Sequence, residues 1–365
     1  MKKLFIAISA LSVIAFSAKA QDVQAAAAEA AAALSAAEDV PVVEPKPKYW
    51  DLSVQNNINF GQTYLFQWAA GGYNNYSLAA GIDANANYAK GKMVWNNRLQ
   101  LDYGFIYSAD KPIIQKNKDR IYFESKWGFE TPIQHLYYSA NLDFRTQFNN
   151  NYNYGTPASD GTNEPTREEW LAARELKSGL LSPAYLNIGL GLKWTPKPWF
   201  ELNFAPLTGG VVIVNDPSLR YVYGMDLVKG STYRTETAEG RASDAERKAA
   251  FDAPDYAQFN AVRYEFGAQL KADAKWVIND NFTYTTQVAA FYNYLTPKIE
   301  PRITWDNKVF WKMAKYFAFT ISTNLIYDPL VLVRDTDGDK TPDAKGVQFK
   351  EYLEFGFTYT IAAKK

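Results

Sequence analysis

Hydrophobic and polar residues alternate along most of this chain. In residues 92–108, KMVWNNRLQLDYGFIYS, apolar or aromatic side chains occupy nearly every second position, and Asn96, Arg98, Gln100 and Asp102 lie between them. A period of two is the spacing of a β-strand whose two faces meet different surroundings. The pattern therefore predicts a strand with one apolar face and one polar face.

About twelve segments show this pattern, and many are longer than the 5 to 6 residues usual for strands of soluble proteins. An even number of long antiparallel strands is typical of outer-membrane barrels. We predict an all-β fold, a transmembrane antiparallel β-barrel of about 12 strands. The expected strands are residues 49–66, 74–90, 92–108, 118–131, 135–149, 183–195, 198–213, 258–277, 281–296, 300–313, 315–328 and 348–362.

The connections between these segments alternate in length. Tight connections follow Ala89, Thr131, Thr195, Ile278 and Met313. The connections between them are mostly long, although the first, at Ala69, is short; the longest cover residues 150–182, 215–257 and 328–347. Short periplasmic turns that alternate with long surface loops are typical of a transmembrane barrel, whereas a soluble sandwich has no reason to segregate them. We expect both termini in the periplasm, the apolar faces against lipid and the polar faces toward the interior.

The N-terminal region does not share the alternating pattern. Residues 1–20 carry Lys2 and Lys3, an apolar core and a small-x-small end at Ala18 and Ala20, as in a secretory signal peptide. Residues 21–48 are rich in alanine and proline, which predicts a periplasmic linker or a docking helix. The barrel is expected over residues 49–365, in the outer membrane.

Composition narrows the function. Aromatic residues make up 16% of the chain, enough for belts at both membrane interfaces. The chain has no cysteine and one histidine, His135, which excludes thiol chemistry and multi-histidine zinc sites. Because His135 falls in a predicted tight turn without a second histidine, we expect no enzyme activity and assign no catalytic residue. Basic and acidic residues are equal in number, and nothing suggests nucleic-acid binding.

The polar faces carry charges of both signs. Two interpretations stay open: an aqueous pore with basic and acidic walls, or a network of ion pairs that fills a narrow lumen. The residues expected to line the lumen are Arg98, Asp102, Arg120, Glu124, Lys126, Asp143, Arg145, Arg263, Glu265, Lys271, Arg302, Asp306 and Glu354.

The long loops add further candidates. The segments that begin at Glu164 and Ser243 are predicted to form short helices, the second with Ser243 as N-cap and Glu246 three residues on. Folded inward they would constrict the pore, and folded outward they would bind something or form a cap. In DTDGDKTPD, residues 335–343, alternating aspartates are suited to calcium, and a solvated acidic loop is the alternative. The metal ligands would be Asp335, Asp337, Asp339 and Asp343.

Several stretches resemble a known family. They include residues 60–105, KDRIYFESKWGFE from Lys118, SPAYLNIGLGLKW from Ser182, APLTGG from Ala205 and KEYLEFGFTY from Lys350. In this order they resemble a family of outer-membrane barrels from Bacteroidota that is named only as domain of unknown function 3078. The resemblance implies a barrel of unknown biochemical role and supplies no catalytic residue.

These observations lead to two functional hypotheses. The first is a narrow porin-like channel for small polar solutes. The second is a non-conducting barrel that acts as a scaffold or partner-binding subunit of an outer-membrane complex. For either we expect contact with membrane lipid and lipopolysaccharide and insertion by the barrel-assembly machinery, whose signal the C-terminal EFGFTYTI resembles. We expect no cofactor other than calcium in the aspartate loop, and the sequence identifies no protein partner.

Overall fold

The computed structural model describes residues 49–64, 73–158, 164–235, 240–336, 338 and 341–362. By its internal contacts the chain divides into two units, residues 1–48 and 49–365. The segments predicted as signal peptide and linker lie outside the described residues and stay predictions. No helix in the described part of the chain is long and apolar enough to cross a membrane.

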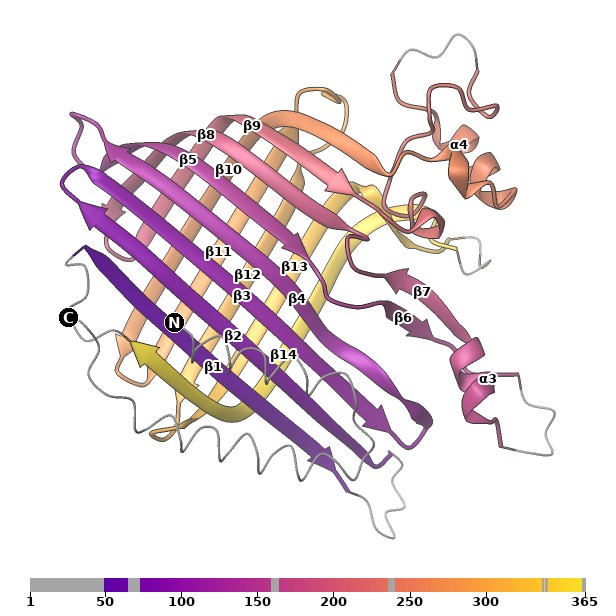
Figure 1. Ribbon diagram of the computed structural model, residues 1–365, viewed down its shortest axis with the longest axis horizontal. Coiled ribbons are helices and arrows are strands. Elements are labelled where there is room, and N and C mark those ends of the chain that lie inside the picture. Colours follow the sequence, from indigo (N-terminus) through magenta and orange to yellow (C-terminus); the bar gives the residue numbers. More distant parts are fainter. Residues whose placement is uncertain are drawn as a thin grey trace, which may run out of the picture. The chain divides into compact units, whose positions relative to one another are not determined.

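Twelve of the described strands form a closed antiparallel barrel, which confirms the predicted fold class (Figure 1). Each strand pairs with its neighbour along the chain, and β1 closes the ring by pairing with β14, where Ile58 faces Phe357. The barrel strands are β1 (Trp50–Thr63), β2 (Asn75–Lys90), β3 (Met93–Ser108), β4 (Lys111–Glu130), β5 (Leu136–Thr146), β8 (Ala184–Lys197), β9 (Phe200–Ile213), β10 (Val262–Asn279), β11 (Phe282–Asn293), β12 (Arg302–Lys312), β13 (Phe317–Arg334) and β14 (Ala344–Ala362).

One end of the barrel carries short turns, and the long loops lie at the other end, where β3 and β4 are also joined by a short turn. The turn between β2 and β3 has two residues and places Gly91 at φ 56°, a left-handed conformation that glycine adopts without steric cost. At the other end the chain forms β6 (Asn151–Tyr154), α3 (Arg167–Ala172) and β7 (Arg174–Ser178) between β5 and β8. It forms η2 (Pro217–Leu219), α4 (Asp244–Asp252) and η3 (Tyr256–Gln258) between β9 and β10. Figure 1 shows α3 and α4 at this same end.

Several predicted boundaries were wrong. Strand β4 begins at Lys111 instead of residue 118, because residues 111–116 still pair with the end of β3. Strand β13 runs to Arg334 instead of residue 328, because Leu332 and Arg334 pair with β14. The helix after Glu164 is confirmed only for six residues, since the following residues form β7 and pair with β6.

The prediction for the second helix is confirmed. Ser243 is the N-cap of α4, and its hydroxyl accepts a hydrogen bond from the backbone N–H of Glu246 at 3.2 Å. The Glu246 carboxylate in turn accepts from the backbone N–H of Ser243 at 2.8 Å. This reciprocal capping box satisfies two N–H groups that a helix start otherwise leaves unpaired.

Burial along the barrel strands is the inverse of that in a soluble β protein. On β8 the side chains of Ile188, Leu190 and Trp194 are exposed, Leu190 by 53% of its surface. On the same strand Lys193 is only 3% exposed and Asn187 is buried as well. Because successive side chains point to opposite faces, the barrel has an apolar exterior and a polar interior.

Candidate functional site in the barrel interior

The barrel interior holds a cavity of about 860 Å³ that is lined mainly by polar and charged residues. All twelve barrel strands contribute residues to its wall. It extends from Trp199 and Lys275 near the short turns to Gln348 and Tyr223 near the long loops. The interior is therefore one continuous compartment in which side chains of opposite walls meet.

A group of five charged residues crosses the interior nearest the short turns. We call this group, Glu124, Lys126, Glu201, Lys271 and Asp273, the Lys126 network. Lys126 Nζ lies 3.4 Å from Glu124 Oε2, 3.3 Å from Glu201 Oε1 and 3.1 Å from Asp273 Oδ2. Glu124 also forms an ion pair with Lys271. Since β5, β8 and β9 separate β4 from β10 in the barrel wall, these ion pairs brace the lumen internally.

Further ion pairs cross the interior between β4 and β14. Lys118 Nζ is 2.7 Å from Glu354 Oε1 and 3.4 Å from Asp102 Oδ1. On neighbouring strands, Arg98 and Asp83 pair at 2.6 Å. Both groups border the cavity, so the lumen is narrowed by paired charges at this level too.

At the loop end of the interior, Glu265 lies between two arginines. Its Oε1 is 3.1 Å from Arg263 Nη2, and its Oε2 is 3.1 Å from Arg302 Nη2. Arg302 also lies 3.8 Å from Asp328. Because Arg263 further donates to the backbone carbonyls of Tyr223 and Gly224, at 3.1 and 2.9 Å, this cluster attaches the loop that follows β9 to the barrel.

Two interior arginines have no such carboxylate partner. Arg120 stacks over the ring of Tyr122, with its guanidinium carbon 4.9 Å from the ring centroid. Arg145 stacks over the ring of Tyr185 at 4.5 Å. Within the described ranges no Asp or Glu oxygen lies at ion-pair distance from either guanidinium. We call these two residues the arginine pair; both border the cavity.

The loop between β9 and β10 folds into a cap, which we define as residues 214–235 and 240–261. Its buried residues form one apolar cluster around Tyr221, Leu227 and Phe259 and another around Leu219 and Met225. Its two stems are held together by Arg220, which donates to the carbonyls of Val214, Asn215 and Phe259. The cap is a folded unit at the loop end of the barrel.

The cap is attached to β13 at Gly224. The backbone N–H of Leu332 donates to the carbonyl of Val222 at 2.9 Å. Gly224 has φ 69°, and a Cβ added there would lie 2.1 Å from the carbonyl oxygen of Leu330. Only glycine permits this approach. The cap thus contacts a strand that is separated from β10 by β11 and β12 in the barrel wall.

One carboxylate outside the barrel strands organises the cap. Glu246 accepts hydrogen bonds from the backbone N–H groups of Thr235 and Ser243, both at 2.8 Å, and from their hydroxyls. These backbone and side-chain bonds lower the pKa of Glu246 to about 2, because they stabilise its charged form.

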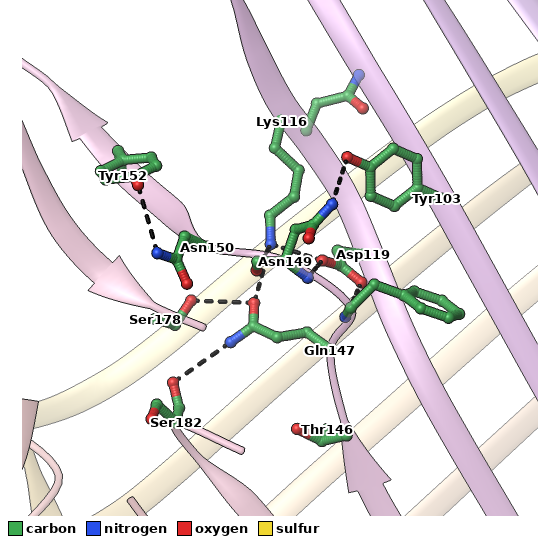
Figure 2. Close-up of polar contacts among 12 residues, drawn as sticks. Tyr103, Lys116, Asp119, Thr146, Gln147, Asn149, Asn150, Tyr152, Ser178 and Ser182 are labelled. Carbon is green, nitrogen blue, oxygen red and sulfur yellow. Dashed lines mark hydrogen bonds and ion pairs between the residues drawn. The ribbon is translucent and has the colours of Figure 1, made fainter. Parts of the chain in front are cut away.

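The loop between β5 and β8 is attached to β4 by a buried ion pair (Figure 2). Lys116 Nζ lies 2.6 Å from Asp119 Oδ2 and donates to the side-chain oxygen of Gln147 and the carbonyl of Asn149. Asp119 accepts from the backbone N–H groups of Phe148 and Asn149 at 2.8 and 3.0 Å. Figure 2 shows these side chains converging where the chain leaves β5.

The structure separates the residues predicted to line the lumen into two sets. Seven do not border the cavity. Six of the seven form the ion pairs described above: Glu124, Lys126, Arg263, Glu265, Lys271 and Arg302. The seventh, Asp143, accepts a hydrogen bond from Asn187. The other six border the cavity: Arg98, Asp102, Arg120, Arg145, Asp306 and Glu354. Tyr122 and Tyr185 were missed, although their parity with Arg120 and Asn187 places them on the inward face.

The remaining sequence candidates lie outside this cavity or at its edge. His135 has φ 64° in the turn after β4, and its carbonyl accepts from the backbone N–H of Thr195 at 2.9 Å. In the aspartate loop, Asp337 and Asp339 lie outside the described residues. Asp335 and Asp343 accept hydrogen bonds from Gly338 and Thr336. Among the described residues no group of three or more acidic or histidine side chains is placed to hold a metal ion, so calcium binding stays a prediction.

Comparison with known proteins adds the following. Residues 60–152 match a family described as "Protein of unknown function (DUF3078)". No curated protein matches the chain. Similar solved structures include an outer-membrane channel from Pseudomonas putida F1, with 8% identity, 89% of this chain and 99% of that chain covered, and a TM-score of 0.34. The translocator domain of the autotransporter NalP from Neisseria meningitidis gives 9% identity, 94% and 98% coverage, and a TM-score of 0.33. These similarities are too low to support a functional argument, which rests on the interior described above.

Proposed function

We propose that this protein is an outer-membrane barrel that works as a narrow channel for small polar solutes. The observation that carries the proposal is the cavity of about 860 Å³, lined mainly by polar and charged residues and bordered by all twelve strands, inside a barrel with an apolar exterior. Water-filled interiors of this kind, closed by a sheet without edges, are the usual way for strands to conduct solutes through lipid.

Exposed aromatic residues at both ends of the strands support a membrane location. Trp95, Trp199 and Trp276 are exposed near the short turns, and Tyr292 and Tyr294 are exposed near the long loops. Aromatic side chains favour the two interfaces of a bilayer. Between them lie strands of 11 to 20 residues, long enough to cross an apolar band of about 25 Å at a tilt.

The orientation follows from the two ends of the barrel. Trp50 and Ala362 begin and end the barrel at the side of the short turns. Short turns of outer-membrane barrels face the periplasm, so both termini would be periplasmic, and lipopolysaccharide would surround the end that carries the cap. Insertion would then require the barrel-assembly machinery.

The proposal is tested by conductance in planar bilayers. Purified full-length protein is expected to give stepwise currents in potassium chloride, small because ion pairs between β4, β10 and β14 narrow the lumen. The cap is expected to limit the current further. Gly224→Ala forces a Cβ against the carbonyl of Leu330 and should detach the cap from β13, which increases the conductance.

Gly230→Ala is the matched control, since a Cβ at Gly230 meets nothing within 4 Å. It is expected to conduct like the unaltered protein. Absence of currents from both variants and from the unaltered protein would overturn the channel.

One observation favours a second function, a non-conducting scaffold. The cap has its own apolar clusters and is held to β10 and β13, so it offers a partner a folded surface at the loop end of the barrel. On this hypothesis the same Gly224→Ala variant would stay electrically silent, and a protein partner would copurify with the unaltered barrel and dissociate from the variant.

A further inference from the structure

The arginine pair lies on the inward face at the junction of β4, β5 and β8. Tyr122 on β4 faces Arg145 on β5, and Arg145 faces Tyr185 on β8. Arg120 is two residues from Tyr122 on the same face, which makes Arg120 and Arg145 diagonal neighbours. Diagonal neighbours in an antiparallel pair have their Cβ atoms roughly 7 Å apart. Two guanidinium groups at this spacing can reach one small ligand.

Three carboxylates at neighbouring strand positions of the arginine pair are engaged with other partners. Asp102, which faces Arg120 on β3, pairs with Lys118 at 3.4 Å. Asp143, two residues from Arg145, accepts a hydrogen bond from Asn187 at 3.1 Å. Glu124 accepts from the hydroxyl of Tyr122 at 3.0 Å and pairs with Lys271 and Lys126.

The tyrosine rings hold the two guanidinium groups without using their N–H donors. Stacking on a ring face fixes the plane of a guanidinium, and its five donors stay directed outward from the edge. A planar fork of donors matches the oxygens of a carboxylate or a phosphate, with two parallel hydrogen bonds to each guanidinium. The contact with a tyrosine ring therefore leaves the donors of both residues available to an anion.

Other arginines of the interior show the difference. Arg98, Arg263 and Arg302 each have a carboxylate at 2.6 to 3.1 Å, so their donors are already used. Of the arginines that the described strands direct inward, only the two of the arginine pair border the cavity without a carboxylate partner.

We propose that Arg120 and Arg145 form a binding site for the oxyanion group, carboxylate or phosphate, of a small solute in the barrel cavity. The proposal deepens the channel function. Passage of the solute rests on that function, whereas binding of the anion does not require a conducting channel. The site gives the channel a preference for anionic solutes and places their charged group between β4 and β8.

Calorimetric titration of the full-length protein in detergent with inorganic phosphate tests the site. The unaltered protein is expected to bind phosphate at one site. Arg120→Gln and Arg145→Gln are each expected to weaken binding about tenfold, the loss of a charge-assisted pair of hydrogen bonds. Arg145→Lys keeps the charge but not the planar fork, and is expected to weaken binding almost as much.

Lys308→Gln is the matched control, because Lys308 borders the same cavity and its removal takes away the same charge. It is expected to retain phosphate affinity within about twofold. Equal weakening by Lys308→Gln and Arg145→Gln, or an unaffected Arg145→Lys, would overturn the site in favour of a diffuse positive field. Heat-dependent migration in gels establishes that each variant is folded.

The channel function and the anion-binding site can each be refuted without the other. Phosphate binding without current in bilayers would remove the channel and leave the anion site. Current without phosphate binding, or binding that survives the replacement of both arginines, would remove the anion site and leave the channel.

Discussion

The Lys126 network and the arginine pair share strand β4, and yet they differ in what their charges are free to do. In the Lys126 network each lysine has carboxylate oxygens within 3.4 Å, and the side chains of Glu124 and Lys126 are only 10 and 11% exposed. In the arginine pair the partners are tyrosine rings. The same alternation of side chains along β4 thus produces an internal brace and, a few residues away, donors available to a ligand.

The largest expected effect comes from breaking the brace. Glu124→Ala leaves Lys271 without its carboxylate in a buried site, and removal of one partner of a buried ion pair costs about 3 to 5 kcal/mol. We expect a loss of this size in the free energy of unfolding, measured by urea titration in detergent micelles. Arg120→Gln breaks no ion pair and is expected to cost about 1 kcal/mol or less. Equal losses would show that the two regions do not differ.

A second prediction concerns the two arginines that share the carboxylate of Glu265. Glu265→Gln keeps the shape of the side chain but releases Arg263 and Arg302 from their carboxylate. The ratio of chloride to potassium permeability, from the reversal potential in a salt gradient, is expected to rise about twofold. Asp306→Asn removes the same charge from the cavity wall, where Asp306 accepts from Asn324. A rise as large in this control would assign the effect to net charge alone.

A smaller effect is expected when the ring beneath one arginine is removed. Tyr185→Leu deprives Arg145 of its stacking partner, which contributes about 0.5 to 1 kcal/mol. Phosphate affinity, measured by calorimetry, should fall about threefold. Tyr352→Leu removes a ring that stacks with Lys118 and Lys350 instead, and should leave the affinity unchanged. The reverse order of effects would contradict the assignment of the site to the arginine pair.

The smallest effect concerns the cap. Because the pKa of Glu246 is lowered to about 2, its contribution to the cap is fully present above about pH 4.5 and is lost as the pH falls through about 2. Limited proteolysis with pepsin should therefore spare residues 240–252 at pH 4 and cleave them faster at pH 2. Glu246→Ala should be cleaved at both pH values. Cleavage between residues 147 and 183 in the same sample is the internal reference.

The sequence predicts the barrel well, because a period of two is a local property that each strand displays by itself. All twelve barrel strands follow from it, and the helix after Ser243 follows from another local signal, the N-cap Ser243 with Glu246 three residues on. The start of β4 and the end of β13 do not follow from the period of two, since Pro112 and Pro329 interrupt the pattern there and pairing with neighbouring strands extends the strands. The hairpin of β6 and β7 is too short to show a period.

The sequence predicts less of the candidate site. Parity places Arg120, Glu124, Lys126 and Arg145 on one face, but it does not reveal which charges meet. Lys126 and Asp273 are 147 residues apart, and their contact depends on how the closed barrel brings β4 toward β10. Tyr122 and Tyr185 were missed because aromatic residues of a barrel are expected at the lipid interface.

Adjacent side chains in β3 have opposite surroundings, as a barrel that stands in lipid requires. Leu99 is exposed on the exterior, whereas Gln100 borders the cavity and donates to Asp83 at 3.2 Å. Because the chain has no cysteine, a nitroxide can be attached to Leu99→Cys or Gln100→Cys alone and its collisions measured by electron paramagnetic resonance in liposomes. We predict that a label at residue 99 meets oxygen dissolved in lipid and that a label at residue 100 meets a water-soluble nickel chelate. Equal access to nickel at both positions would contradict a barrel that stands in lipid around a polar lumen.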